Sequence, residues 1–196
     1  DSSKIVFKYG ESELRIIGSE GGESKILWSS LDQAVLAYPM DWSRDGRNIL
    51  FVALDLAGAT AQLAIIPSKG GEPRLLVKEK LNDLGDQFRF SPDGRFIVGS
   101  KTRNGNDDIY LWAVDGGIEV RLTEDPAEDA FPLWSPEGNY IVFTSNRSKT
   151  VDLWALPMQG SKPAGLPVPL KRNLGANTRP TEFTPGGILT MLITGE

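Results

Sequence analysis

The sequence predicts an all-β fold, a β-propeller built from four-stranded antiparallel blades. Two motifs, an aromatic–hydroxyl turn and an apolar strand that ends in a glycine turn, each recur four times with nearly the same spacing. Several short strands between these turns are apolar on both faces. Glycine (21) and proline (13) are abundant among the 196 residues, as expected when many short strands are joined by turns.

The first motif is an aromatic residue, then Ser or Thr, then a turn that ends in glycine. In its fullest copy, 90–94, proline presets φ, aspartate hydrogen-bonds back to the backbone, and glycine accepts a positive φ. Successive copies are 48, 44 and 49 residues apart, measured between the hydroxyl residues Ser43, Ser91, Ser135 and Thr184. Since the motif recurs once per repeat, we interpret Ser91 as a turn residue rather than as a catalytic nucleophile.

The second motif is an apolar strand followed by a glycine turn. The first glycines of these turns are 49, 46 and 44 residues apart, at Gly21, Gly70, Gly116 and Gly160. Two markers that share one period indicate an internal repeat of forty-odd residues.

One repeat can be followed through all its strands. Strand one covers 88–91 and strand two covers 95–100; a polar loop over 101–107 follows, and then come strand three at 108–114 and strand four at 119–122. Four short strands joined by hairpin turns, repeated at this period, are typical of a propeller blade.

The whole chain, 1–196, is expected to form a single, partial propeller domain of about four blades. Strands such as 49–52 and 141–143 are continuously apolar, because neighbouring blades cover a blade on both faces. The predicted blades cover 4–28 (partial), 35–77, 87–122, 131–170 and 180–194 (partial).

Composition excludes several functions. The formal net charge is −5 and the sequence pI is about 4.9, so the chain lacks the basic stripe that nucleic acid binding needs. Cysteine and histidine are both absent, which excludes disulfides, zinc–thiolate sites and a Ser-His-Asp triad within these residues. With no run of eighteen apolar residues, we expect no membrane insertion, and we expect the N-terminus to carry no signal peptide.

Two repeats carry a family resemblance. The segment 90–95, followed by 108–110 and the 116–117 turn, resembles the repeat of the TolB-like, PD40-type (WD40-like) β-propeller family. The segment 134–138, followed by 152–154, is similar to the same repeat.

The resemblance implies a closed ring, usually of six blades. Members of this family include the periplasmic TolB protein, substrate-gating domains of prolyl-oligopeptidase-like and tricorn-like peptidases, and sensor domains of bacterial regulators. It therefore implies a bacterial protein in the periplasm or in another extracytoplasmic compartment. This chain is too short for six blades.

An open arc of blades would expose an apolar face at each end. If each face leaves roughly 400 Å² in water, the lost burial is about 10 kcal/mol per end, comparable with the stability of a whole domain. We therefore expect either a fragment of a protein with a six- to eight-bladed ring, or a homodimer whose copies pair their open faces.

The residue before each buried aromatic is the best candidate for a binding position. Asp41, Arg89, Leu133 and Glu182 are equivalent but chemically different, whereas the aromatic residues that follow them stay alike. Uniform positions indicate packing, and divergent ones indicate a site or solvent. Because first strands line the central channel, we predict that Asp41, Arg89 and Glu182 face it and contact a partner.

A calcium site was a competing interpretation of the polar residues before the third strands. Asp107, Asp108 and Asp152, with Asn104 and Asn106, offer oxygen ligands of the kind that Ca²⁺ prefers. The ligand series of a calcium loop is incomplete, so we expect no metal and no other cofactor, and interpret the carboxylates as caps of backbone amides.

These observations predict a non-catalytic interaction or sensor domain that binds a protein or peptide. The alternative is the substrate-gating propeller of a prolyl-oligopeptidase-like or tricorn-like serine peptidase, with the catalytic domain outside this chain. A Gly-x-Ser-x-Gly elbow and a distal histidine downstream would favour the peptidase. A propeller lyase or lactonase is disfavoured, because such metal-dependent enzymes usually need histidine ligands.

Overall fold

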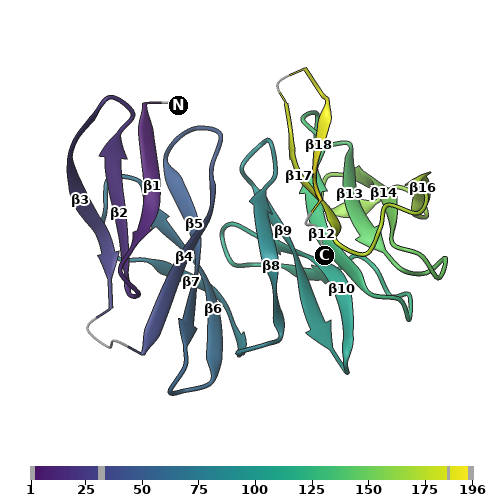
Figure 1. The fold of residues 1–196 in the computed structure, drawn as a ribbon, viewed down its shortest axis with the longest axis horizontal. Helices are drawn as coiled ribbons and strands as arrows, with labels where there is room; N and C mark the ends of the chain where they lie inside the picture. The colour runs from purple at the N-terminus through teal and green to yellow at the C-terminus, as the bar shows by residue number, and fades with distance from the viewer. Residues whose placement is uncertain (1–2, 31–33, 185, 194–196) are drawn as a thin grey trace. The chain divides into compact units, whose positions relative to one another are not determined.

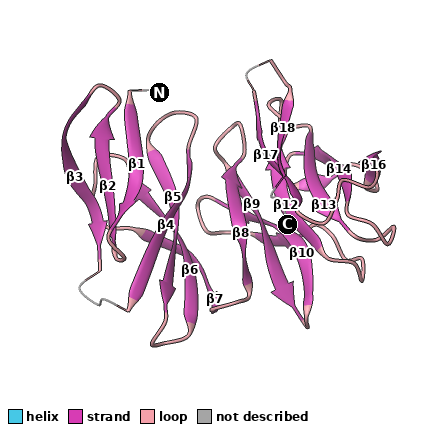
Figure 2. Ribbon diagram, viewed as in Figure 1, coloured by secondary structure: helices cyan, strands magenta, loops and turns pink. Residues whose placement is uncertain are grey.

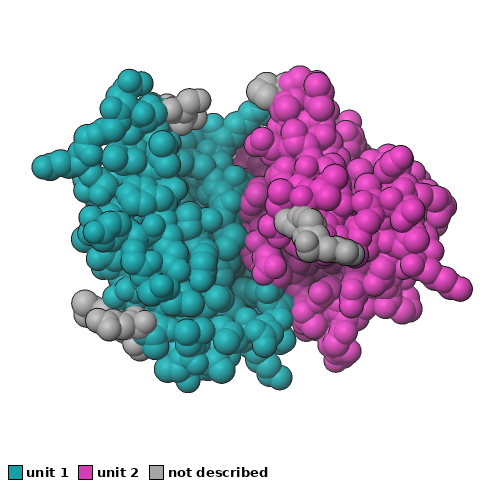
Figure 3. All heavy atoms as spheres, in the orientation of Figure 1, with its two compact units in different colours: residues 1–84 teal, residues 85–196 magenta. Residues whose placement is uncertain are grey.

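The computed structural model describes residues 3–30, 34–184 and 186–193. These residues form 18 strands and no helix (Figure 2), which confirms the predicted all-β fold. Consequently, no helix long and apolar enough to cross a membrane occurs among them. The chain divides into two compact units, residues 1–84 and 85–196, coloured separately in Figure 3. Residue 194, at the end of the last predicted blade, lies outside the described residues.

The first unit contains two antiparallel sheets in which strand order follows chain order (Figure 1). The three-stranded sheet consists of β1 (Lys4–Tyr9), β2 (Glu13–Gly18) and β3 (Gly21–Ser29). The four-stranded sheet consists of β4 (Val35–Trp42), β5 (Asn48–Asp55), β6 (Thr60–Pro67) and β7 (Arg74–Lys80).

The second unit contains two larger sheets and a hairpin. The first sheet consists of β8 (Leu84–Phe90), β9 (Phe96–Arg103), β10 (Asn106–Ala113) and β11 (Glu119–Arg121). The second consists of β12 (Asp129–Trp134), β13 (Tyr140–Ser145), β14 (Asp152–Gln159), the short β15 (Lys162–Pro163) and β16 (Val168–Lys171), and both β15 and β16 pair with β14. The hairpin is β17 (Thr178–Phe183) with β18 (Leu189–Ile193).

The hairpin between β9 and β10 corrects the predicted loop at 101–107. Arg103 pairs with Asn106, so only Asn104 and Gly105 remain in the turn, and both have positive φ (55° and 78°). Asn-Gly is the preferred sequence for a two-residue turn of this kind, whose twist matches the flanking strands. The prediction was wrong because polar side chains do not prevent backbone pairing, and these residues continue the β9–β10 ladder on both sides of the turn.

The core of the first unit lies between its two sheets. Leu14 and Leu27 from the three-stranded sheet are buried in one cluster with Ile49, Phe51 and Ile66 from the four-stranded sheet. Trp28 adds an aromatic contact with Phe51, with ring centroids 5.2 Å apart. The two sheets therefore pack face to face.

In the second unit, one strand shows how a sheet is covered on both faces. Ile141 and Phe143 of β13 are buried in a cluster with residues of β9 and β10, such as Val98 and Leu111. Val142, between them, points to the opposite face and belongs to a cluster against which the β17–β18 hairpin packs. Alternate residues of a strand point to opposite faces, so the continuous apolar run reflects burial on both, as predicted.

Gly99 of β9 is packed closely against two aromatic rings. A Cβ built at this position would lie 2.2 Å and 2.3 Å from ring atoms of Phe88 and 3.1 Å from Trp112. The Phe88 side chain is fully buried, and its ring contacts that of Trp112 at a centroid distance of 5.9 Å. A methyl group added at Gly99 therefore has no room unless both rings move.

We expect Gly99→Ala to destabilise the protein by about 1–3 kcal/mol, since overpacking of a well-packed core costs that much. Denaturant unfolding measures the change. Gly117→Ala is the matched control, because its added Cβ would meet only a side-chain oxygen of Asp115, at 3.5 Å, and should change stability by less than about 0.5 kcal/mol. Equal stability of the two variants would contradict the packing argument.

Candidate functional site

The predicted binding positions lie on the first strand of four successive sheets. These strands are β4, β8, β12 and β17, here called the inner strands, and the first three are edge strands of their sheets. Asp41 and Arg89 are half-buried, Glu182 is exposed, and Leu133 is 5% exposed. Leu133 is therefore a core residue, whereas the other three positions have access to solvent.

Three of the four inner strands carry a β-bulge beside the candidate position. At each one the pairing register with the next strand shifts, so that extra residues bend the inner strand. A bulge re-aims side chains, and bulges are common next to functional sites. The shifts lie between Pro39 and Asp41, between Ala130 and Leu133, and between Pro180 and Glu182.

Proline explains where the bulges fall. Pro39, Pro132 and Pro180 each lie two or three residues before the aromatic residue of the motif. Proline lacks the N–H that a regular ladder needs, so it is confined to edges and bulges of sheets. At the β12 bulge, Phe131 also has a positive φ of 53°. The recurring proline was the signal in the sequence, and our sequence analysis missed it.

In the second unit, contacts at the bulge join three inner strands. The buried side chain of Gln87 on β8 donates from Nε2 to the carbonyl oxygen of Pro132 on β12, at 3.2 Å. The guanidinium of Arg179 on β17 lies 5.3 Å from the ring centroid of Phe131 on β12. Gln87, Phe131 and Arg179 were not predicted as site residues, because their proximity depends on how the sheets pack.

Two candidate side chains interact with their own strand. Asp41, which belongs to the first unit, accepts a hydrogen bond at Oδ1 from the backbone N–H of Trp42, at 2.9 Å. Arg89, in the second unit, donates from Nη1 to the carbonyl oxygen of Phe88, at 3.0 Å. The carboxylate of Asp41 and the guanidinium of Arg89 therefore lie close to their own backbone, and both side chains remain half-exposed.

The serine hydroxyls of the motif have a structural role, as predicted. Ser91 Oγ donates to Asp93 Oδ1 at 2.6 Å and accepts from the backbone N–H of Phe96 at 2.9 Å. Ser43 makes the same two bonds, at 2.7 Å to Asp45 and at 2.9 Å from Asn48 N–H. Each hydroxyl therefore closes its hairpin turn from both sides.

The other two copies of the motif keep the backbone bond. Ser135 Oγ accepts from the N–H of Tyr140 at 3.2 Å, and Thr184 Oγ1 accepts from the N–H of Ile188 at 3.1 Å. Pro185, which continues the fourth motif, lies outside the described residues. The hydrogen bond from the residue four or five positions ahead is thus common to all four turns.

Two of the three carboxylates that could have held calcium lie beside arginines, and the third, Asp107, accepts a hydrogen bond at Oδ1 from Thr102 Oγ1. Asp108 and Asp152 have fully buried side chains, and the guanidinium groups of Arg121 and Arg172 approach them to 2.6 Å and 3.6 Å. Burial raises the pKa of Asp108 against the opposing hydrogen bond from Arg121, whereas the backbone N–H of Asn173 lowers that of Asp152.

The two carboxylates are thus placed beside arginine side chains of their own sheet or the loop that follows it. No group of three or more acidic, His or Cys side chains that could hold a metal ion occurs in the described part of the chain. The proposed cap is found at one position, where Asp152 Oδ1 accepts from the N–H of Asn173 at 2.8 Å. Asp108 instead pairs with an arginine side chain, which the sequence analysis did not foresee.

Repeated antiparallel sheets, four of the five carrying a hydroxyl turn, define the class of β-propeller proteins. The chain belongs to the TolB β-propeller domain family, whose PD40 model matches residues 3–189. This match confirms the resemblance seen in the motifs.

Three similar proteins illustrate the range of the family. An uncharacterized protein of Agrobacterium fabrum is 35% identical over 97 residues, which are 50% of this chain and 32% of that protein. The uncharacterized peptidase YuxL of Bacillus subtilis is 28% identical over 150 residues, covering 57% of this chain and 22% of the peptidase. The crystal structure of TolB from Acinetobacter baumannii shares the fold, with a TM-score of 0.72 and 21% identity, over 100% of this chain and 48% of that chain.

The chain thus spans about a third or less of the two relatives and about half of the TolB structure.

Asp93 provides a test of the hydroxyl turn through its pH dependence. Burial raises its pKa, but hydrogen bonds from Ser91 and from the N–H of Arg95 outweigh this and hold the pKa below the ordinary 3.8. The folded state therefore keeps the carboxylate ionised where the unfolded chain already binds a proton. Its stabilisation is complete well above pH 3.8 and is lost as the pH falls through the folded pKa.

We expect Asp93→Asn to lower the free energy of unfolding by roughly 0.5–1.5 kcal/mol at pH 7, the worth of a typical hydrogen bond, and by much less near pH 2. Urea unfolding at both pH values measures this. Asp86→Asn, at an exposed carboxylate of β8, is the control and should show little effect at either pH. A loss for Asp93→Asn that is equal at both pH values would refute the ionic contribution.

Proposed function

We propose that this chain is a non-catalytic part of a TolB-like propeller that binds a protein or peptide partner. The proposal rests on the difference between constant and variable positions of the inner strands. The hydroxyl turn and the aromatic residue are common to all four repeats, whereas the position beside them is Asp41, Arg89, Leu133 or Glu182. A constant frame with variable side chains is suited to recognition.

The geometry of the inner strands supports this proposal. Bulges beside Asp41 and Glu182 turn the strand locally, which frees side chains from the regular alternation. Asp41 in the first unit would contact basic groups of a partner, and Arg89 and Glu182 in the second unit would contact groups of either charge. Charge complementarity of that kind mainly sets specificity and association rate.

A non-catalytic role is supported by what the residues lack and by what the serines do. The sequence holds neither His nor Cys, so it supplies no histidine base and no thiolate nucleophile. The motif hydroxyls of Ser43 and Ser91 are engaged in hairpin turns. The same absence of histidine argues against a histidine-ligated transition-metal site in this part of the protein.

We further propose that additional blades complete one propeller domain around these sheets. Ile5 and Ile26 on the three-stranded sheet are 52% and 56% exposed, and Ile188 and Ile193 of the last hairpin are 68% and 73% exposed. Apolar sheet faces of this kind are normally covered. Further residues of a longer chain would cover them; a second copy of the chain is the alternative, and sedimentation of the whole protein distinguishes the two.

Similarity to the peptidase YuxL favours a second candidate function. The chain would then belong to a substrate-gating propeller, with the catalytic serine in another part of the protein. Labelling of the whole protein by a serine-reactive fluorophosphonate would support this candidate, and absence of labelling would support the binding function. For TolB-like binding we propose an extracytoplasmic location, which cell fractionation tests.

We expect the double variant Asp41→Asn, Arg89→Gln to weaken partner binding by about tenfold or more, because charged groups at a recognition surface each contribute to affinity. The partner is recovered with the unmodified protein as bait, and its affinity is then measured directly for each variant. The control is Asp115→Asn with Arg103→Gln, two exposed residues away from the inner strands. Unchanged affinity of the first double variant would remove these residues from the binding surface.

A further inference from the structure

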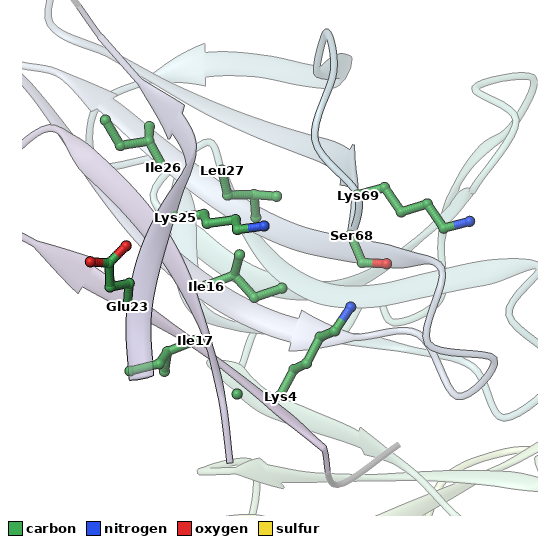
Figure 4. Close-up of a pocket in the computed structure, with 10 residues that line it drawn as sticks. Lys4, Ile16, Ile17, Glu23, Lys25, Ile26, Leu27, Ser68 and Lys69 are labelled. Atoms are coloured by element: carbon green, nitrogen blue, oxygen red, sulfur yellow. The ribbon is translucent and has the colours of Figure 1, made fainter. Parts of the chain in front are cut away.

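The first unit contains a groove at one end of its three-stranded sheet. Its volume is about 350 Å³, and it lies between the ends of β1, β2 and β3 and the turn that follows β6 (Figure 4). The lining residues that matter here are Lys4, Ile16, Lys25, Leu27, Ser68 and Lys69. All of them belong to one compact unit.

The floor of the groove is an extension of the core. Leu27 is buried, and Ile16 packs against the same cluster between the two sheets. Ser68 forms a fixed wall, because its Oγ donates to the carbonyl oxygen of Gly46 at 2.7 Å and its N–H donates to that of Arg47 at 2.8 Å. The groove therefore combines an apolar floor with a rigid polar wall.

Three lysines surround this floor. Among the described residues, none of the ammonium groups of Lys4, Lys25 and Lys69 makes an ion pair, whereas the whole chain carries a net charge of −5. Glu23 also lines the groove, but Figure 4 shows its carboxylate pointing away from the lysines. The local charge is thus opposite to that of the chain.

Edge-strand protection is the ordinary explanation for lysines at such positions. β1 and β3 are the outer strands of their sheet, and lysine on an outer strand discourages pairing with another chain. In Figure 4, however, the side chains of Lys4 and Lys25 extend over the groove towards Ser68. Protection of the edge does not require them to converge there.

We infer that this groove binds a small organic anion with an apolar portion, such as an aliphatic carboxylate. The carboxylate would lie between Lys4 and Lys25, and the aliphatic chain would lie on Ile16 and Leu27. The volume is within the usual range of small-molecule sites, roughly 300–1,000 Å³, and an apolar lining with a few convergent polar groups is typical of them. Because none of these residues lies on an inner strand, the groove is independent of partner binding there.

Calorimetric titration of the whole protein with octanoate tests the inference, with octanamide as the uncharged analogue. We expect octanoate to bind more tightly than octanamide, and the double variant Lys4→Gln, Lys25→Gln to weaken octanoate binding by about threefold to tenfold. The matched control is Lys78→Gln with Lys80→Gln, two exposed lysines of β7 outside the groove. It should bind octanoate as the unmodified protein does.

Three results would overturn the inference: no saturable octanoate binding, equal affinity for octanoate and octanamide, or equal weakening in both double variants. Binding of a tetra-aspartate peptide in place of octanoate would assign the lysines to a protein partner, and would also overturn it. Lys69→Gln changes only a turn residue of the groove and replaces the double variant if that variant does not fold. Weaker octanoate binding by Lys69→Gln supports the inference, and unchanged binding overturns it.

Discussion

Burial of the central strands on both faces is the constraint on which the rest of this structure depends. In β13, Ile141 and Phe143 pack against one neighbouring sheet and Val142 packs towards the β17–β18 hairpin. Burial on both faces is why the run 141–143 is continuously apolar, and the buried polar residues of β13, Thr144 and Ser145, lie at the end of the strand. Gly99 shows the same constraint at its limit, since Phe88 and Trp112 leave no room for a side chain.

The register of successive strands within a sheet is set partly by the hairpin turns that join them. The hydroxyl of Ser91 does so by bonding both to the turn carboxylate and to a backbone amide across the turn. This local bond accounts for the motif better than catalysis does. On the inner strands, bulges at Pro39, Pro132 and Pro180 lie beside the positions whose residues differ between repeats. The hydroxyl turn that follows is the same in each repeat.

Charge is distributed in two ways in this protein. Buried carboxylates such as Asp108 and Asp129 are paired with arginines, as in the contact of 2.7 Å between Arg147 Nη2 and Asp129 Oδ2. These pairs join neighbouring segments within one sheet. The lysines at the end of the three-stranded sheet differ, because among the described residues they have no acidic partner, and apolar side chains lie beside them.

The repeat, the antiparallel blades and the turn role of the serines could be predicted from the sequence, because each depends on residues within a few positions of one another. Two features differ from the prediction for physical reasons: polar residues around Asn104–Gly105 continue the strands instead of forming a longer loop, and the bulges lie at prolines for which the sequence analysis gives no role. The contact of Gln87 with Pro132, and the groove that Lys4 shares with Lys69, 65 residues away, depend on the folded structure. Such contacts depend on how one sheet packs on the next, and no local pattern encodes that.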